Sequence, residues 1–186
     1  MPRRKATLRS RWWRAHFASI QFCFRCGHKL KRRYIKEEGT RRHVCSSCGQ
    51  ITYLNPKIVA GIIPVMSDGR LVLLRRNIEP ALGRWTYPAG FQEMGESVRT
   101  AAEREAMEEI GTTVKLGDLI GIYSYADAGV VTVVYAGRVP RGERPRVTPE
   151  ALEVGVFKHS EIPWKDLAFR STVEALQDWK KGKVRS

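Results

Sequence analysis

One stretch constrains the fold of this chain more than any other: residues 90–112, which read GFQEMGESVRTAAEREAMEEIGT. Ser97 follows the Gly95 turn and is a favourable helix N-cap, and no Gly or Pro then interrupts the chain before Gly111, a natural C-cap. These signals predict a helix between Ser97 and Gly111. Its apolar residues recur at helical spacing and are Val98, Ala102, Ala106 and Ile110.

Three glutamates share one side of that predicted helix. At about 100° per residue, Glu105, Glu108 and Glu109 fall within about 100° of arc at the border of the apolar stripe. Carboxylates three and four residues apart repel each other, and Arg104, four residues before Glu108, relieves only part of that repulsion. A divalent cation would relieve more, and several hard oxygen ligands on one face suit Mg²⁺ or Mn²⁺. The alternative is an ordinary solvated acidic face.

The spacing of the whole stretch favours the metal site. It resembles the Nudix box, the signature of the Nudix hydrolases, at every fixed charged and Gly position. Two positions depart from the usual pattern: Ala106 is small for its aliphatic position, and Thr112 replaces an aliphatic residue. Neither is a ligand position, so both concern packing rather than chemistry. The matching positions are Gly90, Glu96, Arg104, Glu105, Glu108, Glu109 and Gly111.

The resemblance implies a role for each charged residue of the box. Glu105 and Glu109 should be the main ligands of the catalytic Mg²⁺ or Mn²⁺, and Glu108 should be a further ligand or the base. Arg104 and Glu96 should form a supporting pair that orients the helix and its ligands.

Residues on either side of the box complete the implied metal site. In this fold the turn 88–90, Pro-Ala-Gly, brings the backbone carbonyl of Ala89 to the metal, and that close approach explains its small residues. Glu150 and Glu153 stand where the family often keeps a further acid that helps hold magnesium or activates water. A solvated loop is the alternative there, and only one of the two need be functional. Glu108, Glu150 and Glu153 all stay open as the group that takes the proton.

The four cysteines predict a second, structural metal site. They form two Cys-x-x-Cys pairs separated by 18 residues, and a Gly follows each pair. Two such turns bring four thiolates into a closed tetrahedral site for Zn²⁺. Disulfides are the alternative staple for so short a segment, but nothing indicates export. His28 and His43 flank the site and are expected outside the ligand set. The cysteines are Cys23, Cys26, Cys45 and Cys48.

The rest of the chain reads as strands followed by helices. The apolar runs predict the strands of a buried sheet, and a hairpin turn at 67–70 is expected to join two of them. A helix is expected to begin at Ser160–Trp164. With the resemblance, this implies an α+β fold: a Nudix α/β/α sandwich with a mixed β-sheet, preceded by a small zinc ribbon. The expected strands cover 57–65, 71–76, 116–125, 130–139 and a segment ending at 157, and the last helix covers 169–181.

The predicted organisation has three parts: a basic tail over 1–19, a zinc ribbon over 20–54 and a Nudix hydrolase domain over 55–182. The formal net charge is +14. Residues 1–50 hold 14 Lys and Arg against two acids, Glu37 and Glu38. A basic head on a near-neutral body suggests contact with polyanions such as nucleic acid, phosphorylated ligands or an anionic surface. The alternative is a soluble basic module whose charge has no dedicated partner.

No apolar run approaches the roughly 18 residues that span a membrane, so no membrane partner is expected. No secretory signal is visible, and the expected location is the cytoplasm. The acid-free, Arg-rich start is also compatible with an organellar transit peptide, which therefore stays open.

The resemblance covers roughly residues 20 to 180 and extends to the ribbon-bearing Nudix hydrolases of the ADP-ribose, FAD or NADH pyrophosphatase type. It implies hydrolysis of the pyrophosphate bond of a nucleoside diphosphate linked to another moiety. NADH pyrophosphatases of this family carry an SQPWPFPxS-like stretch after the box, whereas residues 114–126 here read VKLGDLIGIYSYA. That difference favours ADP-ribose or FAD over strict NADH specificity.

Substrate contacts are expected from residues just before the box. Arg75, Arg76 and Arg84 are candidates to contact a diphosphate, with ordinary strand-end solvation as the alternative. Aromatic side chains could stack on a base, although each is more often a core residue: they are Trp85, Tyr87, Phe91 and Tyr123.

The rival function is a basic zinc-ribbon nucleic-acid binder, or a Nudix protein that processes RNA ends. In a third reading the ribbon pairs two copies into a homodimer. The hydrolase is preferred because no catalytic position of the box is missing.

Overall fold

The structure, a computed structural model, describes residues 19–182, which divide into two compact units. The smaller contains the cysteine segment up to Pro56 with the short segment Ala126–Gly129, and the larger contains the remainder from Lys57 onward. Apart from Ser19, the predicted basic tail lies outside the described residues. Within residues 19–182, no helix is both long and apolar enough to cross a membrane.

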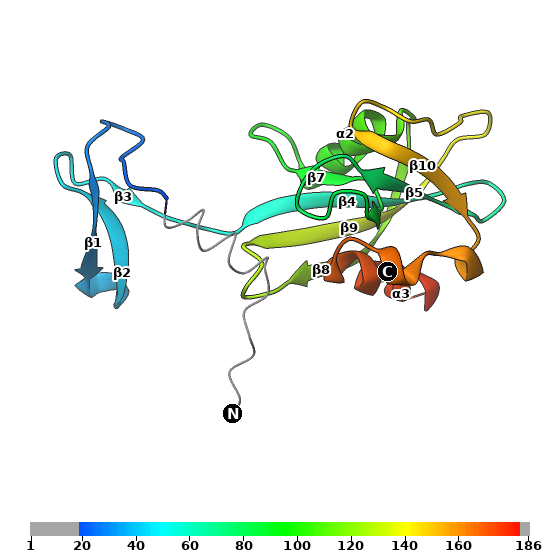
Figure 1. Cartoon of the computed structure of the whole chain (residues 1–186). Coiled ribbons are helices and arrows are strands. Elements are labelled where there is room, and N and C mark those ends of the chain that lie inside the picture. Colours follow the sequence, from blue (N-terminus) through cyan, green and yellow to red (C-terminus); the bar gives the residue numbers. More distant parts are fainter. Residues whose placement is uncertain (1–18, 183–186) are drawn as a thin grey trace. The chain divides into compact units, whose positions relative to one another are not determined.

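The cysteine unit is a three-stranded antiparallel sheet (Figure 1). A short 3₁₀ turn, η1 (Lys36–Glu38), and the left-handed Gly39 join its first two strands into a hairpin. Between residues 19 and 56 three side chains are buried, Cys23, Val44 and Cys45, which is too little for a hydrophobic core. The strands are β1 (Leu30–Ile35), β2 (Thr40–Cys45) and β3 (Ile51–Thr52), in the order β1-β2-β3.

The larger unit is built on a mixed sheet of seven strands. Its main path runs β10-β5-β4-β9-β8, with β6 paired to β5 and β7 paired to β4. The central pair, β4 and β9, is parallel, and the other pairs are antiparallel. The strands are β4 (Lys57–Val65), β5 (Leu71–Arg76), β6 (Trp85–Thr86), β7 (Ala89–Phe91), β8 (Lys115–Ser124), β9 (Val130–Arg138) and β10 (Ala151–Phe157).

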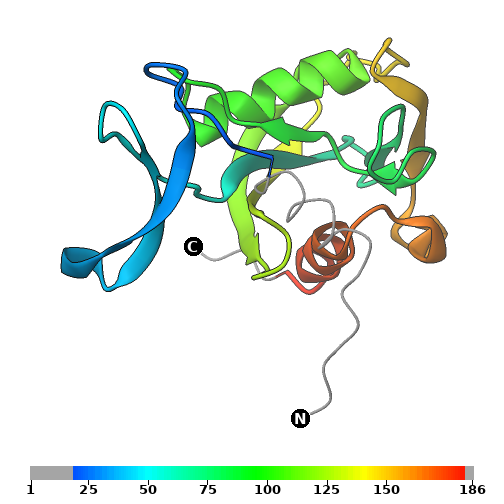
Figure 2. The same cartoon turned by 60° about the vertical axis from the view of Figure 1, so that its left-hand side comes forward.

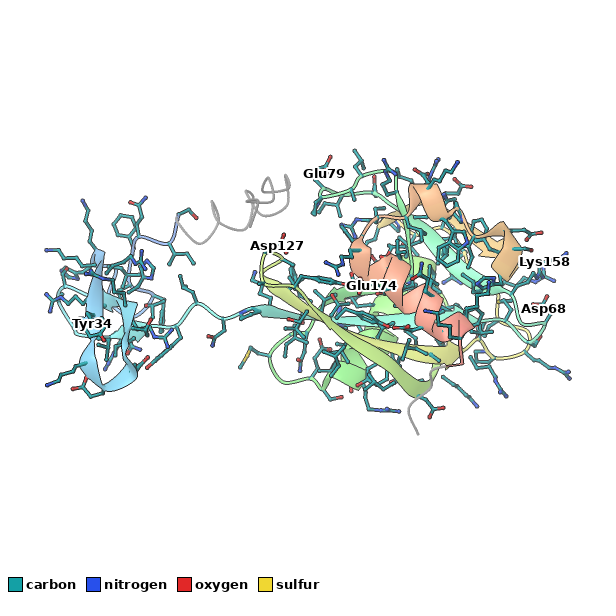
Figure 3. All side chains as sticks on the ribbon, turned by 90° about the horizontal axis from the view of Figure 1, so that it is seen from below. Tyr34, Asp68, Glu79, Asp127, Lys158 and Glu174 are labelled. Atoms are coloured by element: carbon teal, nitrogen blue, oxygen red, sulfur yellow. The ribbon has the colours of Figure 1, made fainter. Side chains whose placement is uncertain are left out.

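Two helices cover opposite faces of this sheet, α2 (Val98–Ile110) on one side and α3 (Arg170–Lys180) on the other (Figures 1 and 2). Figure 3, seen from below, has α3 in front of the sheet. Side chains alternate along β5, so Leu71 and Leu73 pack in the core cluster with α3, and Val72 and Leu74 pack in the cluster with α2. Burial on both faces explains why this strand is apolar throughout. The expected α/β/α sandwich is confirmed.

The prediction of a helix beginning at Ser160–Trp164 is wrong. Two short 3₁₀ turns occupy this region, η2 (His159–Glu161) and η3 (Trp164–Asp166), and the α-helix starts only at Arg170. Ile162 has a ψ of 127°, because the ring of Pro163 disfavours a helical conformation for the residue before it. The short strands β6 and β7 were not predicted, since neither has a run long enough to show a two-residue period.

Helix α2 begins and ends where its capping residues predict. Ser97 Oγ accepts a hydrogen bond from the Thr100 N–H at 3.1 Å, and Gly111 ends the helix in the left-handed region with a φ of 60°. The face that α2 turns to the sheet carries small apolar residues together with two carboxylates, Glu105 and Glu109. The larger unit therefore buries two acidic groups on its α2 side.

Candidate active site and metal centre

The two buried carboxylates of α2 lie against strand β7. Glu105 is 7% exposed and Glu109 is 8% exposed. Glu109 Oε2 accepts a hydrogen bond from the Ala89 N–H at 2.7 Å. Ala89 is fixed in turn by the sheet, because β7 pairs with β4 in a register that places Ala89 opposite Gly61. The sheet thus sets the distance between the turn and the acidic face of the helix.

Gly90 allows the turn to approach that helix. A Cβ built on Gly90 would overlap the carboxylate of Glu105. The carboxylate therefore occupies the space that any other residue at position 90 would fill, which is a physical reason for glycine here.

Arg104 joins the acids of the box into one network. Its Nη2 lies 2.7 Å from Glu96 Oε1, and its Nη1 lies 2.8 Å from Glu105 Oε1 and 2.7 Å from Glu108 Oε2. Nη2 also donates to the Phe91 carbonyl at 3.1 Å, so one guanidinium ties the helix to β7. Hydrogen bonding to Arg104 lowers the pKa of Glu96. The expected pair of Arg104 with Glu96 is present, and Glu105 and Glu108 share the same cation.

Burial sets the electrostatics of the site. Desolvation raises the pKa of Glu109 to about 8, against the lowering effect of the Ala89 N–H and of Arg76, and the charges of Glu105 and Glu150 raise it further. Desolvation also raises the pKa of Glu105, which Arg104 opposes. Burial disfavours the ionised form of both carboxylates. A divalent cation would stabilise that charged form, so the pair is suited to binding one.

The predicted ligands are near one another without forming a closed cage. Among the described residues, the four cysteines form the only group of three or more His, Cys, Asp or Glu side chains placed to hold a metal ion. Arg104 holds Glu105 and the half-exposed Glu108 to one side. The carboxylates offer an incomplete ligand set, as a magnesium site does when waters and substrate phosphates supply the remaining ligands.

The structure separates the two acids predicted after the box. Glu150 is exposed, and its charge acts on both Glu105 and Glu109. Glu153 instead approaches Arg75, with Glu153 Oε2 lying 3.6 Å from Arg75 Nη1. Of the two, Glu150 is the one associated electrostatically with the buried pair.

Two of the three predicted substrate arginines share an acidic partner. Arg84 Nη1 lies 3.2 Å from Asp166 Oδ1, and Arg75 Nη2 lies 3.6 Å from Asp166 Oδ2. Asp166 lies in η3 and matches no motif, so the sequence carried no signal for this cluster. Either arginine would have to leave Asp166, or share it, to contact a diphosphate.

Arg76 is the predicted arginine most closely associated with the buried acids. Its charge lowers the pKa of Glu109. Its Nε donates to the Pro80 carbonyl at 2.9 Å, and its guanidinium lies 5.0 Å from the centre of the Phe169 ring. These contacts hold Arg76 at the end of β5, on the side from which its charge reaches Glu109.

Most of the aromatic candidates are core residues. Trp85 is 7% exposed, packs edge-on against Phe157, and carries the Arg75 guanidinium 5.6 Å from its ring centre. A base could reach this ring only if Arg75 moved. Tyr87 and Tyr123 are buried, whereas Phe91 is 45% exposed. Phe91 is therefore the most exposed of the four, although Lys57 Nζ lies 4.8 Å from its ring centre.

The four cysteines of the smaller unit form a compact sulfur cluster. Their sulfur atoms all lie within 4.8 Å of one another, and all four are free thiols. Backbone N–H groups of Cys48 and Ser47 donate to Cys45 Sγ and lower its pKa to about 6. A converging set of sulfurs with backbone donors that favour a thiolate fits a structural zinc ion.

The histidines near this cluster lie outside it. His28 directs Nδ1 toward the Cys26 carbonyl at 3.1 Å, and neither His28 nor His43 belongs to the ligand group. Gly27 and Gly49, which follow the two Cys pairs, both adopt left-handed φ values, 73° and 72°. Glycine is favoured at such positions, as the turns around the sulfur cluster require.

Two protein-family models together match nearly all of the described residues. The family model described as "NUDIX domain" matches residues 55–177, and the model described as "Nudix N-terminal", a zinc-ribbon family, matches residues 21–54.

Two curated relatives illustrate the range of names among similar proteins. An "ADP-ribose pyrophosphatase" of Methanocaldococcus jannaschii is 29% identical over 161 residues, which cover 84% of this chain and 89% of that protein. An "NAD-capped RNA hydrolase NudC" of Chromobacterium violaceum is 35% identical over 111 residues, which cover 60% of this chain. The match spans only 40% of the length of that second relative.

Solved structures match the fold closely. A "NUDIX hydrolase from Nitrosomonas europaea" is 32% identical with a TM-score of 0.82, and the match covers 88% of this chain and 92% of that one. A "MutT protein from Methanosarcina mazei Go1", 21% identical with a TM-score of 0.58, shares the fold over 72% of this chain.

Proposed function

This chain belongs to the Nudix hydrolase family, and on that premise we propose that it hydrolyses the pyrophosphate bond of a nucleoside diphosphate linked to another moiety. The observation that carries the proposal is the buried pair Glu105 and Glu109 beneath the turn at Ala89 and Gly90. Both have raised pKa values, and their burial is costly unless a cation binds there.

The charged residues around the turn then have separate roles in binding the cation. Glu105 and Glu109, with the carbonyl of Ala89, would hold Mg²⁺ or Mn²⁺, which when bound neutralises phosphate oxygens and acidifies water. Arg104 positions Glu105 and Glu108 through its two short contacts. Glu108, which is half-exposed, serves as a further ligand or as the base, and Glu150 is the alternative base because its charge reaches the buried pair.

For the substrate we favour ADP-ribose, with FAD second. The relative named for ADP-ribose aligns over 89% of its own length, and residues 114–126 lack the stretch that the NADH pyrophosphatases carry. Arg76 is our choice for the diphosphate contact, because its charge already acts at Glu109. Arg75 and Arg84 are secondary, since Asp166 pairs with both.

Capped RNA is a second candidate substrate, supported by the similarity to proteins named NAD-capped RNA hydrolase. A panel of ADP-ribose, FAD, NADH and NAD-capped RNA, each with Mg²⁺ or Mn²⁺, separates these candidates by chromatography of the products. ADP-ribose should yield AMP and ribose 5-phosphate. Absence of turnover for all four, in a zinc-loaded protein with either metal, would refute the proposal. Light scattering on the same sample tests the reading in which the ribbon pairs two copies.

A further inference from the structure

The hairpin of the cysteine unit concentrates positive charge that pyrophosphate hydrolysis does not require. Residues 19–56 contain eight Lys and Arg against two acids, Glu37 and Glu38. Most of these basic side chains are exposed, and all but Arg25 lie on or next to β1 and β2. The basic residues are Arg25, Lys29, Lys31, Arg32, Arg33, Lys36, Arg41 and Arg42.

The strand register sorts this charge onto two faces. Tyr34 lies directly opposite Arg41 in the β1–β2 ladder, and paired residues of an antiparallel ladder project on the same side. Arg32, two residues before Tyr34, shares that side because side chains alternate along a strand. Arg32, Tyr34 and Arg41 thus share one face of the hairpin with His43, which lies opposite Arg32, and we call this the hairpin face.

The hairpin face combines two cations with an exposed aromatic ring. Arg32 and Arg41 are exposed, and Tyr34, labelled in Figure 3, is 60% exposed. A tyrosine this exposed contributes little to a core, and the described unit packs no buried cluster around it. Its ring is available to an external partner, with a guanidinium directly across the ladder.

One of the two acids in residues 19–56, Glu38, is already paired on the opposite face. Glu38 Oε2 lies 2.7 Å from Arg42 Nε, and Tyr53 donates its hydroxyl to Glu38 Oε1 at 2.8 Å. Arg42 is paired with Arg33, so it belongs to the side of the hairpin away from Tyr34. The charge of Glu38 is therefore compensated without drawing on Arg32 or Arg41.

We propose that the hairpin face binds single-stranded nucleic acid, with Tyr34 stacking on a base and Arg32 and Arg41 contacting the flanking phosphates. An exposed aromatic ring among cations is the combination that single strands use, because every unpaired base offers a π-face and every linkage carries a charge. A duplex would engage the arginines and leave the ring of Tyr34 without a role, because its bases already stack on one another. The proposal does not depend on which bond the larger unit hydrolyses.

The test measures fluorescence anisotropy of labelled oligouridylate and oligothymidylate, each longer than the roughly 4–16 nucleotides that such surfaces cover. The full zinc-loaded chain is used without Mg²⁺, so that hydrolysis plays no part. Tyr34→Ala should weaken binding about tenfold and Tyr34→Phe should restore it, because a phenyl ring stacks as a phenol does. The stronger of the RNA and DNA arms identifies the natural strand.

Salt dependence tests the arginines separately. Between about 50 and 200 mM KCl, replacing both Arg32 and Arg41 by Gln should flatten the slope of log affinity against log salt by about 0.7 for each lost phosphate contact. The matched control is Arg141→Gln with Arg144→Gln, which removes the same charge from exposed positions of the larger unit. That control should leave the slope unchanged.

Three results would overturn the proposal. One is unchanged binding in Tyr34→Ala with full zinc content. Another is an equal loss in the control pair and the hairpin pair, which would mean that net charge alone attracts the strand. The third is binding that persists in the hairpin variants and disappears when residues 1–18 are deleted. Stronger binding to phosphatidylserine vesicles than to either oligonucleotide, unaffected by Tyr34→Ala, would instead identify a membrane surface.

Discussion

At the scale of single residues, Glu109 shows why a costly group is retained. Its carboxylate is nearly buried, and its compensation by one backbone N–H and by Arg76 leaves its pKa well above the ordinary value. A protein under selection for stability alone would replace such a group by an uncharged one of similar shape. Its presence beside a close-packed turn is best explained by the binding of a cation.

Glu109→Gln should lower kcat at least about 10²-fold while the protein stays folded. The glutamine oxygen can still accept the Ala89 N–H, so the turn is kept, but the negative charge that holds the cation is lost. Steady-state kinetics and thermal unfolding measure the two effects. Glu103→Gln, an exposed change on the same helix, is the control and should retain full activity. Unimpaired turnover in Glu109→Gln would show that its charge is dispensable.

The raised pKa of Glu109 also predicts a pH dependence of stability in the protein without Mg²⁺. The folded state keeps a proton up to pH about 8, whereas the unfolded chain loses it near 4.5, so the folded state binds more protons in this window. The free energy of unfolding should therefore fall as pH rises from about 4.5 to about 8. Urea titrations of wild type and Glu109→Gln measure the difference. If the two pH profiles are parallel, the pKa of Glu109 is not raised in the folded protein.

Contacts between side chains were predictable from the sequence where one motif contains both partners. Glu96 and Arg104 are eight residues apart, and their pair follows from the box. The association of Arg75 and Arg84 with Asp166 was not predictable, because Asp166 lies about 80 to 90 residues further along the chain, in a short 3₁₀ turn. The burial of Trp85 likewise depends on Phe157, a distant partner that no local pattern identifies.

At the scale of elements, α2 depends on its ends as much as on its buried face. The Ser97 hydroxyl supplies an acceptor for the first turn, and Gly111 supplies the left-handed residue that ends the helix. Since α2 carries Glu105, Glu108 and Glu109, fraying at its start would loosen Arg104 and the acids that it holds.

Ser97→Ala should reduce the free energy of unfolding by about 1 kcal/mol, because the Thr100 N–H loses its acceptor. Ser97→Asp should recover most of that loss, since a carboxylate can accept the same bond and also favours a helix N-terminus. Chemical denaturation followed by circular dichroism gives both values. Equal stability of wild type and Ser97→Ala would mean that the cap contributes nothing.

Long periodic elements were predictable from the sequence and short ones were not. The strands at 57–65 and 71–76 have the bounds that their apolar runs indicate, and α2 has those of its caps. The prediction of a helix at 160–164 failed because the sequence does not distinguish a proline in the first turn of a helix from a proline after an extended residue. The pairings of β6 and β7 are set by neighbours in the sheet, to which a run of two or three residues gives no clue.

At the scale of the whole molecule, the two units are stabilised by different means. The larger unit has two apolar clusters on opposite faces of its sheet, whereas residues 19–56 bury three side chains, two of them cysteines. We therefore expect the smaller unit to depend on a metal ion held by its four cysteines, and the larger one on packing.

Removing zinc should accordingly unfold the smaller unit and leave the larger one folded. We expect about one zinc ion per chain by mass spectrometry, and loss of that ion in Cys26→Ser and Cys48→Ser. Amide spectra should then lose the dispersed signals of β1 and β2 and keep those of the large sheet. Ser47→Ala is the control, because it preserves the backbone N–H that donates to Cys45. Collapse of all dispersed signals together would contradict this division.

The closeness of Gly90 to Glu105 matters for anyone who diversifies this sequence. With the carboxylate already in the space of a side chain, a randomised codon at position 90 should return glycine alone among clones that turn over substrate in a plate screen. The same randomisation at Met94, whose side chain is fully exposed four residues later, should return most amino acids. Position 94 is thus a suitable place to attach a reporter dye, and position 90 sets the limit of what directed evolution can alter in this turn.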